Sequence, residues 1–151
     1  MKYTLIVVLA AFLATPAFSQ KDSGIFLTIP CGKKSPKHTV MLTMKTVCLA
    51  SNPMILSSEF QSVGEVRQQG ERIFFDLTLS RKAVVTMDQL AKNLPNANFA
   101  IVVDKDVFFT FAAQELSGNS TLRFEGPIKD QIAFFAVQEK IKSLIRGGGT
   151  Q

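Results

Sequence analysis

Few residues in this chain of 151 have the types and spacings that suit catalysis or metal binding. The one histidine, His38, and the two cysteines are too few ligands for a tetrahedral zinc site. Asp104 and Asp106 flank Lys105 and could form an acid pair, but carboxylates in a short polar break are more typical of a hairpin turn. The sequence has neither a G-x-S-x-G motif nor a glycine-rich phosphate loop that opens a helix. We therefore expect a protein that is not an enzyme and holds no metal and no cofactor.

The two cysteines, Cys31 and Cys48, have the spacing of a structural pair. In an oxidising compartment an isolated pair usually forms one disulfide. The bond would close a loop of about 17 residues, which the loop-entropy model values at about 3 kcal/mol. A redox-active pair would need the two cysteines close together, as in C-x-x-C. We therefore expect a structural disulfide between Cys31 and Cys48.

The first residues have the pattern of an export signal. Lys2 precedes an uncharged apolar run from Leu5 to Ala14, and the small residues Ala17 and Ser19 fit a signal-peptidase site. The run is shorter than the about 20 residues that span a bilayer, although a membrane anchor is the competing interpretation. No later stretch is long and apolar enough to span a membrane. We expect a cleaved signal peptide over residues 1–19 and an exported protein, periplasmic or extracellular, with no integral membrane segment after cleavage.

Positive charge is in mild excess, with a formal net charge of +5. The basic residues are mostly scattered, so we expect no nucleic-acid partner. One cluster stands out, Lys33, Lys34, Lys37 and His38, in a stretch that also contains Gly, Pro and Ser. A solvated loop is the favoured interpretation of this cluster, and an anionic-ligand site is the alternative.

Hydrophobic periodicity predicts strands and helices that alternate along the chain. Residues 72–80 alternate apolar and polar side chains, as in a half-buried strand, and a helix is predicted between Ser80 and Pro95. The same criteria predict a short helical turn after Ser57, a second helix from Asp130 to Arg146, and strands over 24–30, 39–50, 98–104, 106–113 and 121–126.

These elements indicate an α+β protein built as a two-layer sandwich. We expect a ferredoxin-like arrangement, in which one mostly antiparallel sheet carries both helices on one face. Residues 20–70 would supply N-terminal strands and the disulfide loop, packed on an α+β domain over residues 71–146. Residues 147–151 would form a disordered tail.

Aromatic side chains on the predicted strands raise the question of a binding surface. Strict alternation places Val107, Phe109 and Phe111 on one face of their strand, and Phe108, Thr110 and Ala112 on the other. One of these faces would pack under the helices and the other would meet an N-terminal strand, solvent or a partner. Core packing under an N-terminal strand is the favoured interpretation of Phe108, and an exposed apolar patch that binds a peptide or protein is the alternative, with Phe108, Thr110 and Phe74 as its candidate binding residues. An uncovered sheet edge could also bind an extended chain by strand addition.

The stretch ANFAIVVDKDVFFTFAAQELSGNSTLRFEG, followed by a helix, resembles the head of the first periplasmic domain of SecD, the export-assisting partner of the Sec translocon. An upstream segment, NPMILSSEFQSV, looks like the family's lead into a short helical turn, and the similarity covers about residues 48–145. The matching pieces are Ala100 to Asp104, Val107, Glu115, Ser117-Gly118, Leu122, Gly126 and the helix after Asp130. The resemblance implies a head-like fold and a role in holding unfolded or extended polypeptide outside the membrane.

The chain departs from the SecD pattern at the hairpin. Lys105 stands where the family has a turn glycine, and Phe109-Thr110-Phe111 replaces a Ser-Ala-Pro run. The transmembrane helices that couple SecD to protons have no counterpart, so we expect no proton-driven motor.

The functional expectation is an exported, non-enzymatic protein-binding domain, such as an accessory that contacts exported polypeptides or a Sec-type membrane translocon component. The alternative is a small secreted inhibitor or immunity-type protein that binds one specific partner.

Overall fold

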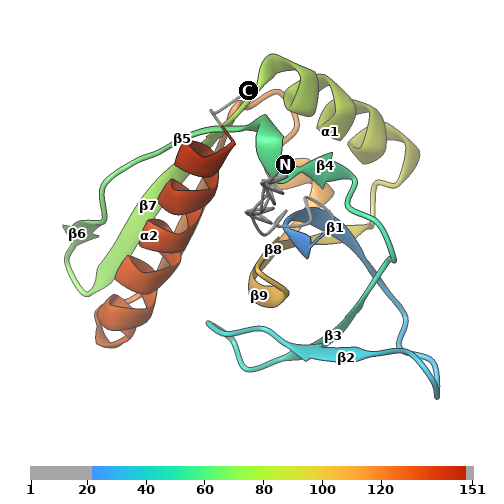
Figure 1. The fold of residues 1–151 in the computed structure, drawn as a ribbon, viewed down its shortest axis with the longest axis horizontal. Coiled ribbons are helices and arrows are strands. Elements are labelled where there is room, and N and C mark those ends of the chain that lie inside the picture. Colours follow the sequence, from blue (N-terminus) through green and yellow to red (C-terminus); the bar gives the residue numbers. More distant parts are fainter. Residues whose placement is uncertain (1–21, 149–151) are drawn as a thin grey trace, which may run out of the picture.

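The computed structural model describes residues 22–148, so the predicted signal peptide and residues 149–151 lie outside the described part of the chain. Two α-helices, α1 (Arg81–Asn93) and α2 (Gln131–Gly147), accompany ten strands in this part (Figure 1). The strands are β1 (Gly24–Ile29), β2 (Lys37–Thr39), β3 (Thr46–Leu49), β4 (Ile55–Leu56), β5 (Phe60–Val63), β6 (Arg67–Gln69), β7 (Arg72–Leu79), β8 (Asn98–Val103), β9 (Asp106–Ala112) and β10 (Thr121–Pro127). Three short 3-10 turns are η2 (Ser57–Glu59), η3 (Ala113–Glu115) and η4 (Ile128–Asp130).

The strands form two antiparallel sheets. In the first sheet the order is β2-β3-β1-β8-β9, with β4 paired to the start of β1. In the second sheet the order is β10-β7-β5, and β6 pairs with β7 on the same side as β5. The α+β class and the antiparallel pairing are confirmed. The single ferredoxin-like sheet is not found, because β7 pairs with β5, β6 and β10 and not with β8 or β9 within residues 22–148.

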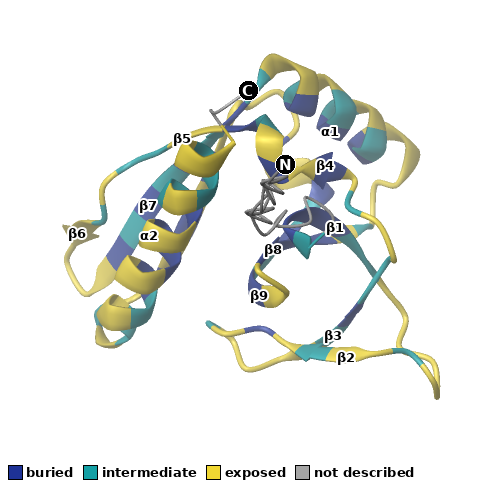
Figure 2. Ribbon diagram, viewed as in Figure 1, coloured by how far each residue is buried: buried dark blue, intermediate teal, exposed yellow. Residues whose placement is uncertain are grey.

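The main core lies between the sheets and the helices. Phe75 of the second sheet stacks on Phe124 and meets Phe134 of α2 edge-on, and Phe124 contacts Phe109 of the first sheet. Buried residues of α1, including Met87, belong to the same cluster. Buried positions follow one face of each helix and alternate along β7 and β10 (Figure 2). The amphipathic patterns in the sequence are therefore the cause of this layering.

A smaller core fills the other face of the first sheet. Phe26, Val40, Ala100, Val102 and Val107 are buried there, with Val47 and Leu49 packed beside them. The end of β1, β2 and β3 form an arm, defined here as residues 28–49, that covers this face. The arm and α1 lie on opposite sides of β1, β8 and β9 in Figure 1. The Met41 N–H donates to the Val107 carbonyl at 2.9 Å, which fastens the arm to β9.

The predicted disulfide is present in the arm. Cys31 and Cys48 are bonded, with their Cα atoms 5.3 Å apart, within the usual range. Cys48 lies opposite Ile29 in the β1–β3 register, so the bond joins the end of β1 to the strand beside it.

The predicted single strand over residues 39–50 is wrong. The chain turns between β2 and β3, where Met44 has a left-handed backbone (φ 55°) and its N–H donates to the Val40 carbonyl at 2.7 Å. No Gly, Pro or Asn marks this turn in the sequence, which is why the pattern reads as continuous strand.

Strands before residue 71 contribute to both sheets, since β1 is paired to β8 in the first and β5 and β6 are paired to β7 in the second. At the other end α2 runs to Gly147, one residue into the predicted tail. In the described part of the chain, no helix is long and apolar enough to cross a membrane.

Candidate binding site

The outer edge of β10 is the clearest candidate site in the second sheet. Within residues 22–148 β10 is paired with β7 alone. The Leu79 N–H donates to the Ser120 carbonyl and the Ile128 N–H to the Glu71 carbonyl, both at 2.8 Å. In an antiparallel ladder the hydrogen-bonded pairs recur every second residue. The even-numbered residues of β10 therefore direct their N–H and C=O groups toward β7.

The odd-numbered residues of β10 direct their backbone groups to the unpaired edge. Thr121, Arg123 and Glu125 each offer an N–H and a C=O there, and their side chains are exposed. Pro127, which has no N–H, falls at an outward position, where a strand proline is tolerated. β10 is thus a seven-residue edge strand with a regular row of backbone donors and acceptors.

The outer face of the second sheet carries an aromatic ring between two arginines. The Arg123 guanidinium lies 4.3 Å from the centre of the Phe74 ring, and that of Arg67 lies 5.1 Å from it. Both arginines also bind Asp76. Its Oδ1 accepts from Arg123 Nε at 2.8 Å, and its Oδ2 accepts from Arg67 Nη2 at 3.0 Å and from Arg123 Nη2 at 3.1 Å. We call these four residues the Arg–Phe–Arg face.

Charge neutralisation stabilises this face. The hydrogen bonds from Arg123 lower the pKa of the Asp76 carboxyl below its usual value, while partial burial acts in the opposite direction. The same contact raises the pKa of Arg123. Beside it, Arg72 and Glu125 form a further ion pair across β7 and β10. Arg123 lies on β10 itself, so its guanidinium can contact the side chains of an added peptide, whereas Phe74 on β7 and Arg67 on β6 lie farther from the open edge.

The structure does not bring the three predicted binding residues together. Phe74 lies on the second sheet, whereas Phe108 and Thr110 lie on β9 of the first. The Phe108 side chain is only 1% exposed, so it packs in the core and is not available to a partner. Thr110 is half-buried opposite Ala100, and Phe74 is half-buried under its two arginines.

A β-bulge explains the position of Phe108. The β8–β9 register shifts so that Ile101 faces Phe109 while Val102 faces Val107, which leaves Phe108 as the extra residue. The bulge exchanges the faces predicted for Val107 and Phe108, while Phe109 and Phe111 share one face as predicted. Phe108, Phe109 and Phe111 all pack in the main core, and Val107 alone joins the smaller one.

Sequence reasoning missed Arg67, Asp76 and Arg123 as a unit. The alternation of residues 72–80 correctly predicts Asp76 on the outer face of its strand, but gives no sign of its arginine partners. The available signal was the alternation of β10, which puts Arg123 on its outer face, but the register with β7 could not be known in advance.

One further cluster includes a serine next to a carboxylate. The Ser80 hydroxyl donates to Glu59 Oε2 and accepts from the Ala83 N–H at 3.1 Å, and Lys82 Nζ lies 3.4 Å from Glu59 Oε1. The hydrogen bond from Ser80 lowers the pKa of Glu59, which makes this carboxylate a weaker base. Because Ser80 caps the start of α1, the cluster is a capping arrangement that ties η2 to the helix.

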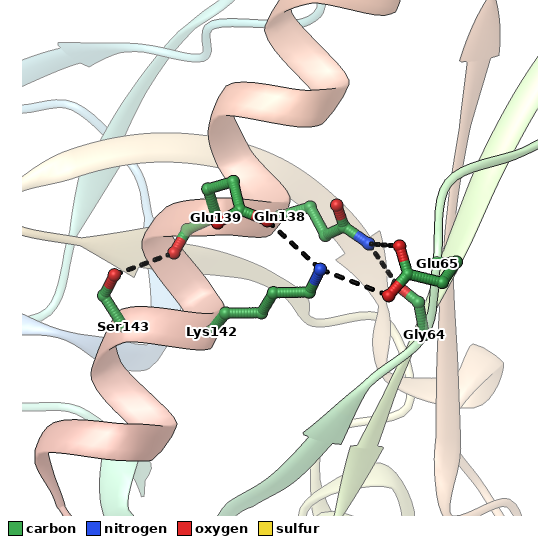
Figure 3. Close-up of polar contacts among 6 residues, drawn as sticks. All are labelled: Gly64, Glu65, Gln138, Glu139, Lys142 and Ser143. Atoms are coloured by element: carbon green, nitrogen blue, oxygen red, sulfur yellow. Dashed lines mark hydrogen bonds and ion pairs between the residues drawn. The ribbon is translucent and has the colours of Figure 1, made fainter.

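A second polar cluster joins α2 to the bend after β5 (Figure 3). Gln138 is 1% exposed, and its Nε2 donates to the Gly64 carbonyl at 2.6 Å and to Glu65 Oε2 at 3.4 Å. Lys142 Nζ lies 3.2 Å from Glu65 Oε1 and 3.1 Å from Glu139 Oε1. The Lys142 contact lowers the pKa of Glu65. These contacts hold the helix on its sheet.

The described residues contain no group of three or more His, Cys, Asp or Glu side chains that could hold a metal ion. Buried polar residues in this part of the chain are Ser23, Ser57 and Gln138, none of them ionisable.

Comparison with protein-family models, with curated proteins and with solved structures found no match to this chain.

Proposed function

We propose that this protein is an exported polypeptide-binding domain that takes up an extended segment as an additional strand on β10. The observation that carries the proposal is the alternation of unpaired backbone groups along β10, with Pro127 at an outward position. An added strand would gain main-chain hydrogen bonds at Thr121, Arg123 and Glu125. Arg123, the member of the Arg–Phe–Arg face that lies on β10, would then contact side chains of the added strand on the same face.

The chemistry of such a site favours limited sequence selectivity. Backbone hydrogen bonds are common to all peptides, whereas guanidinium groups favour acidic and aromatic side chains. This profile suits a holder of extended chains, the role that the SecD resemblance implies. The resemblance itself stays a prediction.

Export is supported by the disulfide in the arm, since such bonds persist mainly in oxidising compartments. The signal peptide at residues 1–19 remains part of the proposal.

The experiment is an NMR titration of the folded domain with an unstructured peptide that contains acidic and aromatic residues. Amide signals of Thr121, Arg123 and Glu125 are expected to shift and to gain protection from exchange, because their N–H groups become hydrogen bonded. Unchanged signals on β10 at millimolar peptide would contradict the proposal.

A proline substitution supplies the matched control. Glu125→Pro removes one outward N–H while leaving the hydrogen bonds to β7, and Glu125→Ala removes the same side chain but keeps the N–H. Peptide binding should be lost in E125P and kept in E125A. Equal binding by both variants would show that peptide attaches elsewhere.

A pull-down of bound proteins separates this proposal from the alternative, an inhibitor with one specific partner. A holder recovers many extended chains weakly, whereas an inhibitor recovers one folded protein in stoichiometric amount.

Self-pairing of β10 between two copies of the protein is a further outcome. With Phe124 on a two-fold axis, Arg123 of one copy would face Glu125 of the other. Sedimentation velocity without peptide detects it as a doubled mass that E125P abolishes.

A further inference from the structure

A cavity lies where the arm crosses the outer face of the first sheet. Its volume is about 660 Å³, within the range of small-molecule sites of about 300–1,000 Å³. Figure 1 shows β2 and β3 passing across the far side of β8 and β9 from α1. The cavity is separate from the β10 edge, which belongs to the second sheet.

The floor of the cavity is apolar and well packed. Phe26 and Val102, which line it, are 6% and 3% exposed and belong to the smaller core. Ile29 and Leu49 extend the apolar lining along the arm. A hydrocarbon or aromatic group placed here would lose contact with water on the side that faces the sheet.

The rim of the cavity is cationic. Lys34 comes from the loop after β1, and Lys105 comes from the β8–β9 turn on the opposite element. His38, Ser35 and Ser51 add hydrogen-bonding groups to the lining. The one acidic lining residue, Asp22, lies 3.8 Å from Lys105. Lys33 and Lys37 flank the same loop, so the potential at the mouth is positive.

The disulfide fastens this rim. Cys31 and Cys48 directly precede the lining residues Gly32 and Leu49, so the bond fixes the loop that carries Lys34 against β3. The turn that carries Lys105 is held from the other side. Its Asp104 N–H donates to Ser23 Oγ at 2.9 Å and its Lys105 N–H to the Asp22 carbonyl at 3.1 Å. Both cationic walls are therefore anchored before a ligand arrives, which lowers the entropic cost of binding.

We propose that this cavity binds a small amphipathic anion, a single hydrocarbon chain with a carboxylate head, whose chain lies on Phe26 and Val102 and whose head lies between Lys34 and Lys105. Charge complementarity selects an anion, and the bounded volume favours a free molecule over a membrane surface. Two members of the basic cluster, Lys34 and His38, line the cavity, which develops the anionic-ligand site that the sequence left as the second interpretation of that cluster.

The test is an NMR titration with dodecanoate below its micelle concentration, with 1-dodecanol as the neutral comparator and acetate as the head group alone. Dodecanoate is expected to shift the amide signals of residues 32–35, 49–51 and Lys105, and both comparators are expected to bind at least about tenfold more weakly, which corresponds to about 1.4 kcal/mol. Equal binding of dodecanol, or shifts spread over the surface, would overturn the proposal.

Matched lysine variants locate the head group. K34A/K105A is expected to weaken dodecanoate binding about tenfold, since each exposed ion pair contributes modestly. K92A/K129A removes the same net charge from exposed positions on other elements and should leave affinity unchanged. Equal weakening in both variants would show a diffuse charge effect and overturn the assignment.

Two further experiments distinguish the source of the anion and the role of the disulfide. The protein should not bind vesicles of phosphatidylglycerol. If it binds these vesicles and does not bind monomeric dodecanoate, the surface is a membrane-binding one and the proposal is overturned. C31S/C48S should weaken dodecanoate binding while E125P leaves it unchanged. This result would separate the cavity from the proposed peptide site, whatever the outcome at β10.

Discussion

The outer strands of the two sheets differ in what covers them. In the first sheet the disulfide-bonded arm reaches the end strand β9, where the Met41 N–H donates to the Val107 carbonyl. The second sheet ends at β10, whose odd-numbered residues direct their backbone groups to the unpaired edge. A long uncovered edge is a hazard that proteins usually shorten or cover. The contrast is that the arm hydrogen bonds to the end strand of the first sheet, whereas β10 is paired with β7 alone within residues 22–148.

The charges along β10 are consistent with a managed edge. Arg123 and Glu125 alternate in sign and are both exposed, which disfavours indiscriminate pairing. Each is already held by a partner on β7, Asp76 or Arg72. The open edge therefore has a fixed set of side chains before any strand is added.

The largest effect is expected in the arm of the first sheet. C31S/C48S should lower the free energy of unfolding by about 3 kcal/mol, the value for a loop of this length. Hydrogen exchange should quicken across the arm and stay slow in β7, because the second sheet does not depend on the bond. Equal loss of protection in both sheets would show that they unfold together.

The next largest effect is expected from a substitution in β10 that disturbs its packing on α2. A Cβ on Gly126 would lie 2.7 Å from the Phe134 ring, which is fully buried. G126A should therefore push β10 away from α2 and cost about 2 kcal/mol, measured by chemical denaturation. G64A is the control, since its Cβ would meet ordinary contacts no closer than 3.6 Å. A loss in G64A as large as that in G126A would argue against steric displacement of β10.

A smaller effect concerns the Arg–Phe–Arg face and depends on pH. The pKa of Asp76 is lowered in the folded state, so its contribution is complete above about pH 4, near the unfolded pKa, and is lost as pH falls through the folded value. D76N should cost about 1 kcal/mol at neutral pH, because the arginines are largely exposed. The difference in melting temperature between D76N and the unsubstituted protein should disappear on acidification, as thermal melts at pH 7 and below pH 3 would show. A difference that is independent of pH would contradict this account.

The smallest effect is expected in the first sheet. Asp104 and Lys105 both have left-handed backbones, with φ of 51° and 73°, as a two-residue hairpin turn requires. K105G removes the strain of a non-glycine residue and should raise stability by about 0.5 kcal/mol. K105A retains the strain and should give no gain. A thermal melt compares the two, and a gain in K105A would assign the effect to charge instead.

Sequence reasoning succeeded where one element determines its own pattern. The alternation of β7, the cap at Ser80 and the apolar stripe of α2 follow from local periodicity, and so did the α+β class. It failed where backbone geometry is decided by distant partners. The bulge at Phe108 depends on the register with β8, and the left-handed turn at Met44 depends on the closure of the arm.

The candidate site was predictable only in part. Strand addition at an uncovered edge was anticipated, but the strand that remains open could not be identified. That choice follows from the separation into two sheets, which is a non-local property. Phe74 was placed correctly on an outer face, and its arginine partners come from β6 and β10, which lie far apart in the sequence.

The central position of β1 dictates a schedule for folding. Its partner β8 lies far along the chain, and the Thr28 hydroxyl donates to the Asn98 carbonyl across 70 residues of sequence. When the N-terminus emerges first, from a ribosome or through a membrane pore, β1 can pair early with β3 and β4, but its pairing with β8 has to wait for most of the polypeptide. Cys31 and Cys48 emerge well before β8, so a thiol oxidase can act on them while the first sheet is still incomplete. Formation of the disulfide can therefore precede the pairing of β1 with β8 and prepare β1 for it.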